Sequence, residues 1–203
     1  MVSDRASLLA SALRLSFLTI GWNGAVGATA LVVSVIDSSL ALAGFALTAL
    51  LDSSASMVLV WRFREELRDP IAAEHLERRA QSWVVVAMLV VAAYVDIQAI
   101  RGLAGHSHPE ASALGVALAG ASVVAMPWLG RAKLRVASRL GSGALRGDGI
   151  LTIASAALAA IALAALLVNA AFGWWWADPT AALVIATALA IEATRVAIRH
   201  RFG

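Results

Sequence analysis

The sequence contains no cysteine, and only 14% of its residues are Asp, Glu, Lys or Arg. The lack of cysteine excludes a disulfide framework and any metal site built from thiolates. No stretch is long and polar enough to form a soluble domain, so we expect a single domain over residues 1–203. No nucleophile and base stand in a recognisable pair, and no closed metal site is apparent, so we do not expect an enzyme.

Apolar residues dominate what is present: 61% of the chain is hydrophobic, and its mean hydropathy is +0.82. Uncharged runs recur at about 20 residues, the length of helix that crosses a hydrocarbon core of about 30 Å. The pattern predicts an all-α membrane protein with six transmembrane helices and no soluble domain. The predicted spans cover about 15–36, 40–61, 80–100, 111–130, 149–171 and 180–198.

The distribution of basic residues predicts the orientation of these spans. Every Lys and Arg except Arg101 lies in a terminal segment or in the connections over 62–79 and 131–146. The positive-inside rule then places the N- and C-termini in the cytoplasm. Although the isoelectric point is about 10.5, the basic residues flank apolar segments instead of forming one patch, so nucleic acid is not expected as a partner. Arginine greatly outnumbers lysine, which hints at a bacterial inner (cytoplasmic) membrane.

Asp52 lies in the middle of the second predicted span, where a charged side chain costs about 2.5 to 3.5 kcal/mol on insertion scales. It should therefore face the protein interior or a wet cavity rather than lipid. Thr48, one turn earlier, shares its helix face. Asp52 stands ten residues before Arg62, which puts it about 15 Å from the cytoplasmic face.

Other polar residues are expected near this depth. Asn23 lies nine residues past Arg14, and Thr152 is at a similar or slightly shallower depth in the fifth span. Asp148 precedes Thr152 by one turn and is expected near the cytoplasmic mouth. The oxygen atoms of Asp52, Thr48, Asn23, Asp148 and Thr152 suit a divalent cation, although zinc normally takes nitrogen or sulfur as well.

Each of these residues also has a purely structural interpretation. Asp52 would be protonated and hydrogen-bonded, holding helices together, and Asp148 would be an acid favoured at a helix N-terminus. His106 and His108 form a weak metal signal in an outer loop, and an ordinary polar loop explains them equally well. Two small-residue faces, Gly24-x-x-x-Ala28 and Gly115-x-x-x-Ala119, suggest close helix packing.

Several motifs together resemble a known family. They are the six spans, Asp52 in span two, Leu145-Arg146-Gly147-Asp148 at the entry to span five, and Trp176-Ala177-Asp178-Pro179 at the start of span six. The sequence resembles the cation diffusion facilitators over nearly its whole length. It is most similar to a branch that lacks the cytoplasmic C-terminal domain, the transmembrane protein 163 type of zinc efflux protein.

The resemblance implies where a metal would bind. The family's transport site has two ligands one turn apart in span two and His-x-x-x-Asp in span five. Here the span-two positions hold Thr48 and Asp52, and the span-five positions fall on Leu151 and Ser155. Only Asp52 keeps the family residue, so Asp148 and Thr152 are the candidate substitutes, or the cation keeps several waters.

The resemblance implies a homodimeric exporter of a divalent cation, with zinc as the expected ion, exchanged for protons by alternating access, with no organic cofactor. The alternative is a degenerate, non-transporting membrane scaffold or regulatory subunit with a structural Asp52. Only residues 199–203 follow the last predicted span, which is too few for a folded cytoplasmic domain. A dimer is therefore expected to form through spans one and four and the outer part of span three.

Overall fold

The computed structural model describes the backbone of residues 2–66, 70–105 and 112–202. These residues form six helices: α1 (Val2–Ile36), α2 (Leu40–Glu66), α3 (Pro70–Gly105), α4 (Ala113–Leu140), α5 (Gly143–Phe172) and α6 (Ala177–Phe202). Each helix carries a stretch long and apolar enough to cross a membrane, as the sequence predicts. The predicted outer loop with His106 and His108 lies outside the described residues.

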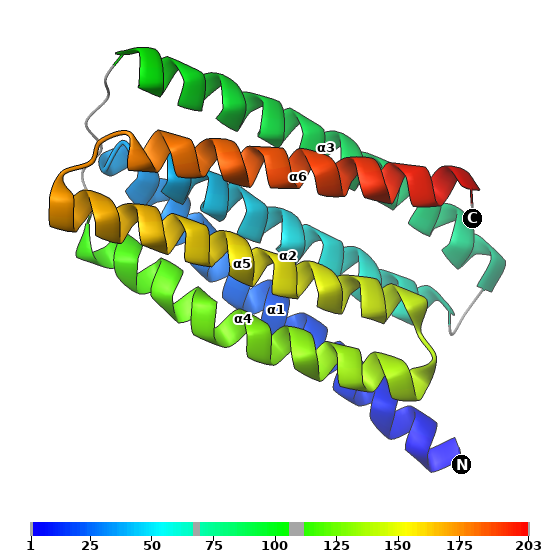
Figure 1. Cartoon of the computed structure of the whole chain (residues 1–203). Coiled ribbons are helices and arrows are strands. Elements are labelled where there is room, and N and C mark those ends of the chain that lie inside the picture. The colour runs from blue at the N-terminus through cyan, green and yellow to red at the C-terminus, as the bar shows by residue number, and fades with distance from the viewer. Residues whose placement is uncertain (1, 67–69, 106–111, 203) are drawn as a thin grey trace.

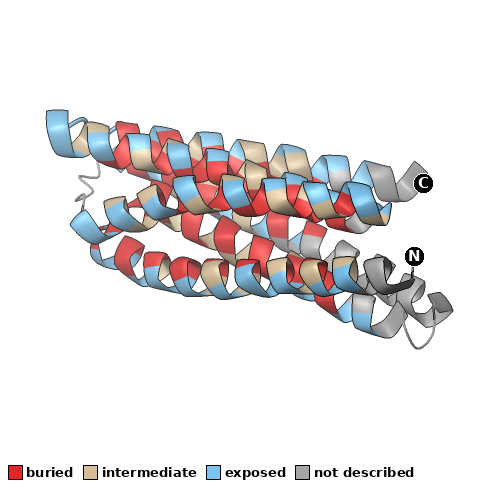
Figure 2. Ribbon diagram, turned by 90° about the horizontal axis from the view of Figure 1, so that it is seen from below, coloured by how far each residue is buried: buried red, intermediate tan, exposed pale blue. Residues whose placement is uncertain are grey.

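The helices pack as a bundle in which α2 takes the central place. It contacts α1 on one side, α3 and α6 on another, and α5 on a third. The N-terminal end of α1 and the C-terminal end of α6 lie at the same end of the bundle (Figure 1), as an even number of spans requires. Buried residues line the inward faces of the helices, and exposed residues cover the outward faces (Figure 2).

The connection between α4 and α5 differs from the prediction. Residues 131–146 were expected to be a basic connection, but α4 continues to Leu140 and α5 begins at Gly143. Gly141 ends α4 with a left-handed φ of 67°, and the Ser142 hydroxyl accepts a hydrogen bond from the Leu145 amide to begin α5. Hydropathy marks where lipid contact ends, whereas these capping groups mark where the helices end.

The short turn makes α4 and α5 antiparallel neighbours, and two glycines bring them close together. A Cβ atom added at Gly130 would lie 2.5 Å from Ile153 Cγ1 and 3.0 Å from the Gly149 carbonyl oxygen. A Cβ atom added at Gly149 would lie 3.1 Å from Leu134 Cγ. Larger residues would therefore hold α4 and α5 apart at this height of the bundle.

The opposite end of the bundle is fastened by Asp178, which belongs to the Trp176–Pro179 motif. Its carboxylate accepts hydrogen bonds from the Ser39 hydroxyl and from the backbone amides of Leu40 (2.7 Å) and Ala41 (3.2 Å). These amides open α2 and have no partner within that helix. Asp178 therefore ties the start of α6 to the start of the central helix.

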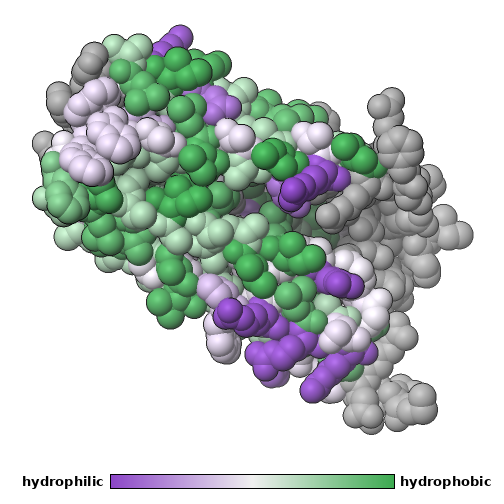
Figure 3. Space-filling model, viewed as in Figure 1, coloured by the Kyte–Doolittle hydropathy of each residue, from purple (hydrophilic) through white to green (hydrophobic). Residues whose placement is uncertain are grey.

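The small-residue face of α4 packs within the protomer, which limits the surfaces at which a dimer could form. Gly115 and Ala119 are buried within the protomer, and the position of Gly115 lies against Leu42 of α2. The expectation that this face of span four is free for a dimer is therefore wrong. The outward face of α3 stays exposed at Leu89 and Tyr94. Figure 3 shows one face of the protein, with apolar residues over most of it and hydrophilic residues gathered towards one end.

The close approach of α4 and α5 leads to a first prediction. Gly130→Ala should lower the midpoint of thermal unfolding in detergent, because overpacking typically costs about 1 to 3 kcal/mol and exceeds the helix-propensity gain of about 1 kcal/mol. Gly147→Ala is the matched control, since an added Cβ atom there meets nothing within 4 Å. It should leave the midpoint unchanged or raise it. Equal midpoints in both variants would contradict this account of the helix contact.

Candidate functional site

A buried ion pair lies between α4 and α5. Lys133 Nζ is 2.6 Å from Asp148 Oδ2, and the side chain of Lys133 is 0% exposed while that of Asp148 is 5% exposed. The two residues stand at nearly equal distances in sequence from the turn at Gly141, so an antiparallel hairpin brings them to the same height. The absence of a side chain at Gly130 and Gly149, next to the pair, allows the two helices to approach.

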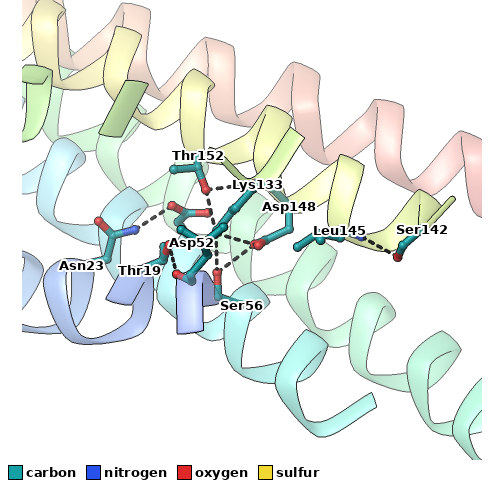
Figure 4. Close-up of polar contacts among 10 residues, drawn as sticks. Thr19, Asn23, Asp52, Ser56, Lys133, Ser142, Leu145, Asp148 and Thr152 are labelled. Atoms are coloured by element: carbon teal, nitrogen blue, oxygen red, sulfur yellow. Dashed lines mark hydrogen bonds and ion pairs between the residues drawn. The ribbon is translucent and has the colours of Figure 1, made fainter. Parts of the chain in front are cut away.

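Two hydroxyl groups complete the surroundings of the ammonium. Lys133 Nζ donates to Thr152 Oγ1 (3.0 Å) on α5 and to Ser56 Oγ (3.2 Å) on α2. Ser56 in turn donates to Asp148 Oδ1 (2.8 Å). An ammonium group has three protons to donate, and here it has three oxygen partners from two helices (Figure 4).

Asp52 lies next to this group, one turn from Ser56 on α2. It is 1% exposed, and its Oδ2 accepts a hydrogen bond of 2.6 Å from Asn23 Nδ2 on α1. Lys133 and Asp148 are near enough for their charges to act on the Asp52 carboxylate. The hydroxyl of Ser155, also buried, lies beside Asp52 and can hydrogen-bond to it. In the described part of the chain, neither the Ser155 hydroxyl nor Asp52 Oδ1 makes a hydrogen bond of ordinary length.

The structure therefore brings together four of the five residues that the sequence singled out. Asn23 and Asp52 are hydrogen-bonded, and Asp148 and Thr152 share the Lys133 ammonium. Asp148 was expected near the cytoplasmic mouth, but it is buried inside the bundle. Thr48, one turn before Asp52 on α2, is also buried. Its hydroxyl donates to the Gly44 carbonyl oxygen of the same helix (2.8 Å) and is not hydrogen-bonded to the cluster.

Lys133 is the residue that sequence reasoning missed. It was counted among the basic residues of a cytoplasmic connection, although it is the only lysine in a chain rich in arginine. Two signals could have drawn attention to it: this uniqueness, and a turn signature, Gly141-Ser142-Gly143, midway between Lys133 and Asp148. Neither signal shows that the side chain points inward, because a lysine close to a helix end can equally extend to water.

The chemistry available at the cluster comes from oxygen atoms. In the described ranges, no three His, Cys, Asp or Glu side chains lie close enough together to hold a metal ion. A cation here would have the carboxylates of Asp52 and Asp148, the hydroxyls of Ser56 and Thr152, and water as ligands. Such hard ligands suit a divalent cation bound with part of its hydration shell.

Six helices of spanning length around buried carboxylates are typical of a membrane transporter, because acidic groups at this depth are costly and mark ion pathways. The family model of the cation efflux transmembrane domain matches residues 16–200. The chain therefore belongs to the cation diffusion facilitator family, which consists of cation transporters and not of enzymes. Comparison with curated proteins gives no match.

The ion pair leads to a second prediction. Either Lys133→Met or Asp148→Asn should lower the free energy of unfolding by about 3 to 5 kcal/mol, because each leaves a buried charge without its partner. The double variant should recover most of that loss, since it leaves neither charge. Unfolding in mixed detergent and SDS micelles measures all three values. Losses that simply add in the double variant would show that the two residues do not depend on each other.

Proposed function

We propose that this protein exports zinc, a divalent cation, from the cytoplasm in exchange for protons. The observation that supports the proposal is Asp52, a fully buried carboxylate in the central helix with one oxygen atom that accepts no hydrogen bond from any residue in the described ranges. Buried polar groups are almost always paired, so this oxygen atom and the Ser155 hydroxyl beside it are suited to binding a cation. Asn23 holds the other oxygen of Asp52 in position.

Exchange for protons follows from the ligand chemistry. A carboxylate binds a metal ion when it is ionised and a proton when it is not, so loading the cation releases protons and protonation releases the cation. In alternating access, the helices would adopt two arrangements that open the site to one side of the membrane or to the other. Competition between the cation and protons for the same carboxylates would then result in antiport. The proposed ligands are Asp52, Asp148 and Thr152, with Asn23 as orienting group, and Thr48 as a further oxygen donor only after a rotation of its side chain.

The proposed setting is the bacterial inner membrane, with the termini in the cytoplasm. We also propose a homodimer that forms through the exposed outward face of α3, at residues such as Val86, Leu89 and Tyr94. Of the other expected dimer surfaces, Gly115 and Ala119 are covered within the protomer, whereas Ala28 on α1 is exposed like the face of α3. Dimerisation would hold α3 and α6 in place while the other helices move.

A second candidate function is a non-transporting scaffold or regulatory subunit. It is supported by the three oxygen partners of the Lys133 ammonium, which satisfy all three of its protons. An ion pair with its hydrogen bonds satisfied in this way is typical of a structural role. This function predicts no stoichiometric binding of zinc or cobalt by calorimetry at micromolar metal. A binding isotherm that disappears in Asp52→Ala would rule it out.

Transport gives a third prediction. In proteoliposomes with zinc- and pH-sensitive dyes, the wild type should move zinc and protons in opposite directions. Asp52→Asn should reduce both fluxes by more than about tenfold, because even orienting partners of metal ligands contribute about 10- to 100-fold. A panel with manganese, cobalt and magnesium identifies the preferred cation.

The matched control is Asp96→Asn on α3, which removes a half-buried carboxylate from a helix that supplies no residue to the cluster. Its fluxes should equal those of the wild type. Equal fluxes in Asp52→Asn and the wild type would contradict the proposed function.

A further inference from the structure

The proposed transport leaves one charged residue of the cluster without a role. Lys133 is the largest fully buried side chain among the described residues, and its ammonium lies among oxygen atoms of α2 and α5. Burying an ammonium is costly, and a neutral pair of similar shape would serve stability as well or better. The position of this charge therefore calls for an explanation beyond packing.

The partners of the ammonium are the same atoms that would bind a cation. Asp148 Oδ2, Thr152 Oγ1 and Ser56 Oγ surround Lys133 Nζ at 2.6 to 3.2 Å. A carboxylate and two hydroxyls form a set of hard oxygen ligands. The adjoining ligand, Asp52 Oδ1, accepts no hydrogen bond in the described part of the protein. One half of the cluster thus holds a cation of the protein itself, and the other half holds a carboxylate oxygen without a hydrogen bond from the described residues.

We propose that Lys133 is a tethered cation that holds Asp148 while the site is empty and that the transported cation displaces it on binding. This inference rests on the proposed function. Electrostatic repulsion explains why the ammonium and the transported cation cannot occupy the cluster together. A divalent cation and the ammonium together would place three positive charges against the two carboxylates in a buried space, where repulsion is only weakly screened. The ammonium must therefore leave Asp148 before that carboxylate can bind the metal ion.

To leave Asp148, the ammonium must move towards the nearer end of α4. Lys133 lies about 10 Å from the end of α4 at Leu140, at 1.5 Å per residue. Ala137, one turn further along α4, is buried against Leu145, so α4 and α5 must part there before the four-carbon chain can reach water. When the cation departs, the ammonium returns to Asp148. Lys133 thereby weakens cation binding and keeps Asp148 from being left charged and unpaired during the empty part of the cycle.

Because Lys133 is the only lysine, its movement can be followed in the unaltered protein. The full chain in nanodiscs is treated with a small amine-reactive reagent, and the modified peptide is quantified by mass spectrometry. Saturating Zn²⁺ should raise the rate of modification at Lys133 by about fivefold or more, because the amine leaves a buried site for a wetter one. The N-terminal amine serves as internal control. An unchanged or lower rate with Zn²⁺ bound would overturn the inference.

The affinity for Zn²⁺ tests the same inference by substitution. Lys133→Met should bind Zn²⁺ about tenfold or more tightly than the wild type, because the competing charge is gone. Arg135→Met removes an exposed charge of the same helix and should stay within about twofold of the wild type. A merely structural Lys133 would leave the affinity of the folded variant unchanged or lower, and that result would overturn the inference.

If Lys133→Met fails to fold, the comparison moves to the Asp148→Asn background. There, Lys133→Met removes the ammonium without leaving Asp148 charged, and it should again raise the affinity for Zn²⁺ relative to Asp148→Asn alone. Equal affinities would overturn the inference while leaving the proposed function intact. Absence of Zn²⁺ binding in the wild type and in every Lys133 variant would contradict the proposed function and the inference with it.

Discussion

The ion pair between Lys133 and Asp148 is the interaction on which the rest of the site depends. It joins a buried ammonium to a buried carboxylate across the α4–α5 contact, where two glycines let these helices approach. Its hydrogen bond to Ser56 links the pair to α2, and Asp52 on the same helix face links it to Asn23 of α1. One polar cluster thus joins α1, α2, α4 and α5.

This arrangement also divides the bundle into two functional parts. Helices α1, α2, α4 and α5 supply the polar cluster, whereas α3 and α6 pack mainly on each other and on α2. Asp178 fastens the second part to the first at one end, through the opening amides of α2. The polar cluster lies entirely within the first of these parts.

Much of the fold follows from the sequence alone. Six apolar runs of spanning length predict six helices, because every backbone polar group in lipid must be satisfied within a helix. The cost of a charge at mid-membrane depth identified Asp52, and helical spacing placed Asn23 and Thr152 at a similar height. The helix ends were less accurate, since hydropathy does not detect the caps at Gly141 and Ser142 that extend α4 and α5.

The tertiary structure alone decided which charges meet. In the sequence, Lys133 and Asp148 each stand beside a predicted span. The pattern assigns Lys133 to a basic cytoplasmic connection and Asp148, a candidate ligand, to the cytoplasmic mouth. Only the packing of α4 against α5 turns them inward, where a lone ammonium or a lone carboxylate would be too costly and each stabilises the other. The sequence determined the six spans and the buried acid of α2, because hydrophobic length and charge cost are local properties. The pairing of Asp148 with Lys133 beside Asp52 depends on how α4 packs against α5, and no local sequence pattern contains that information.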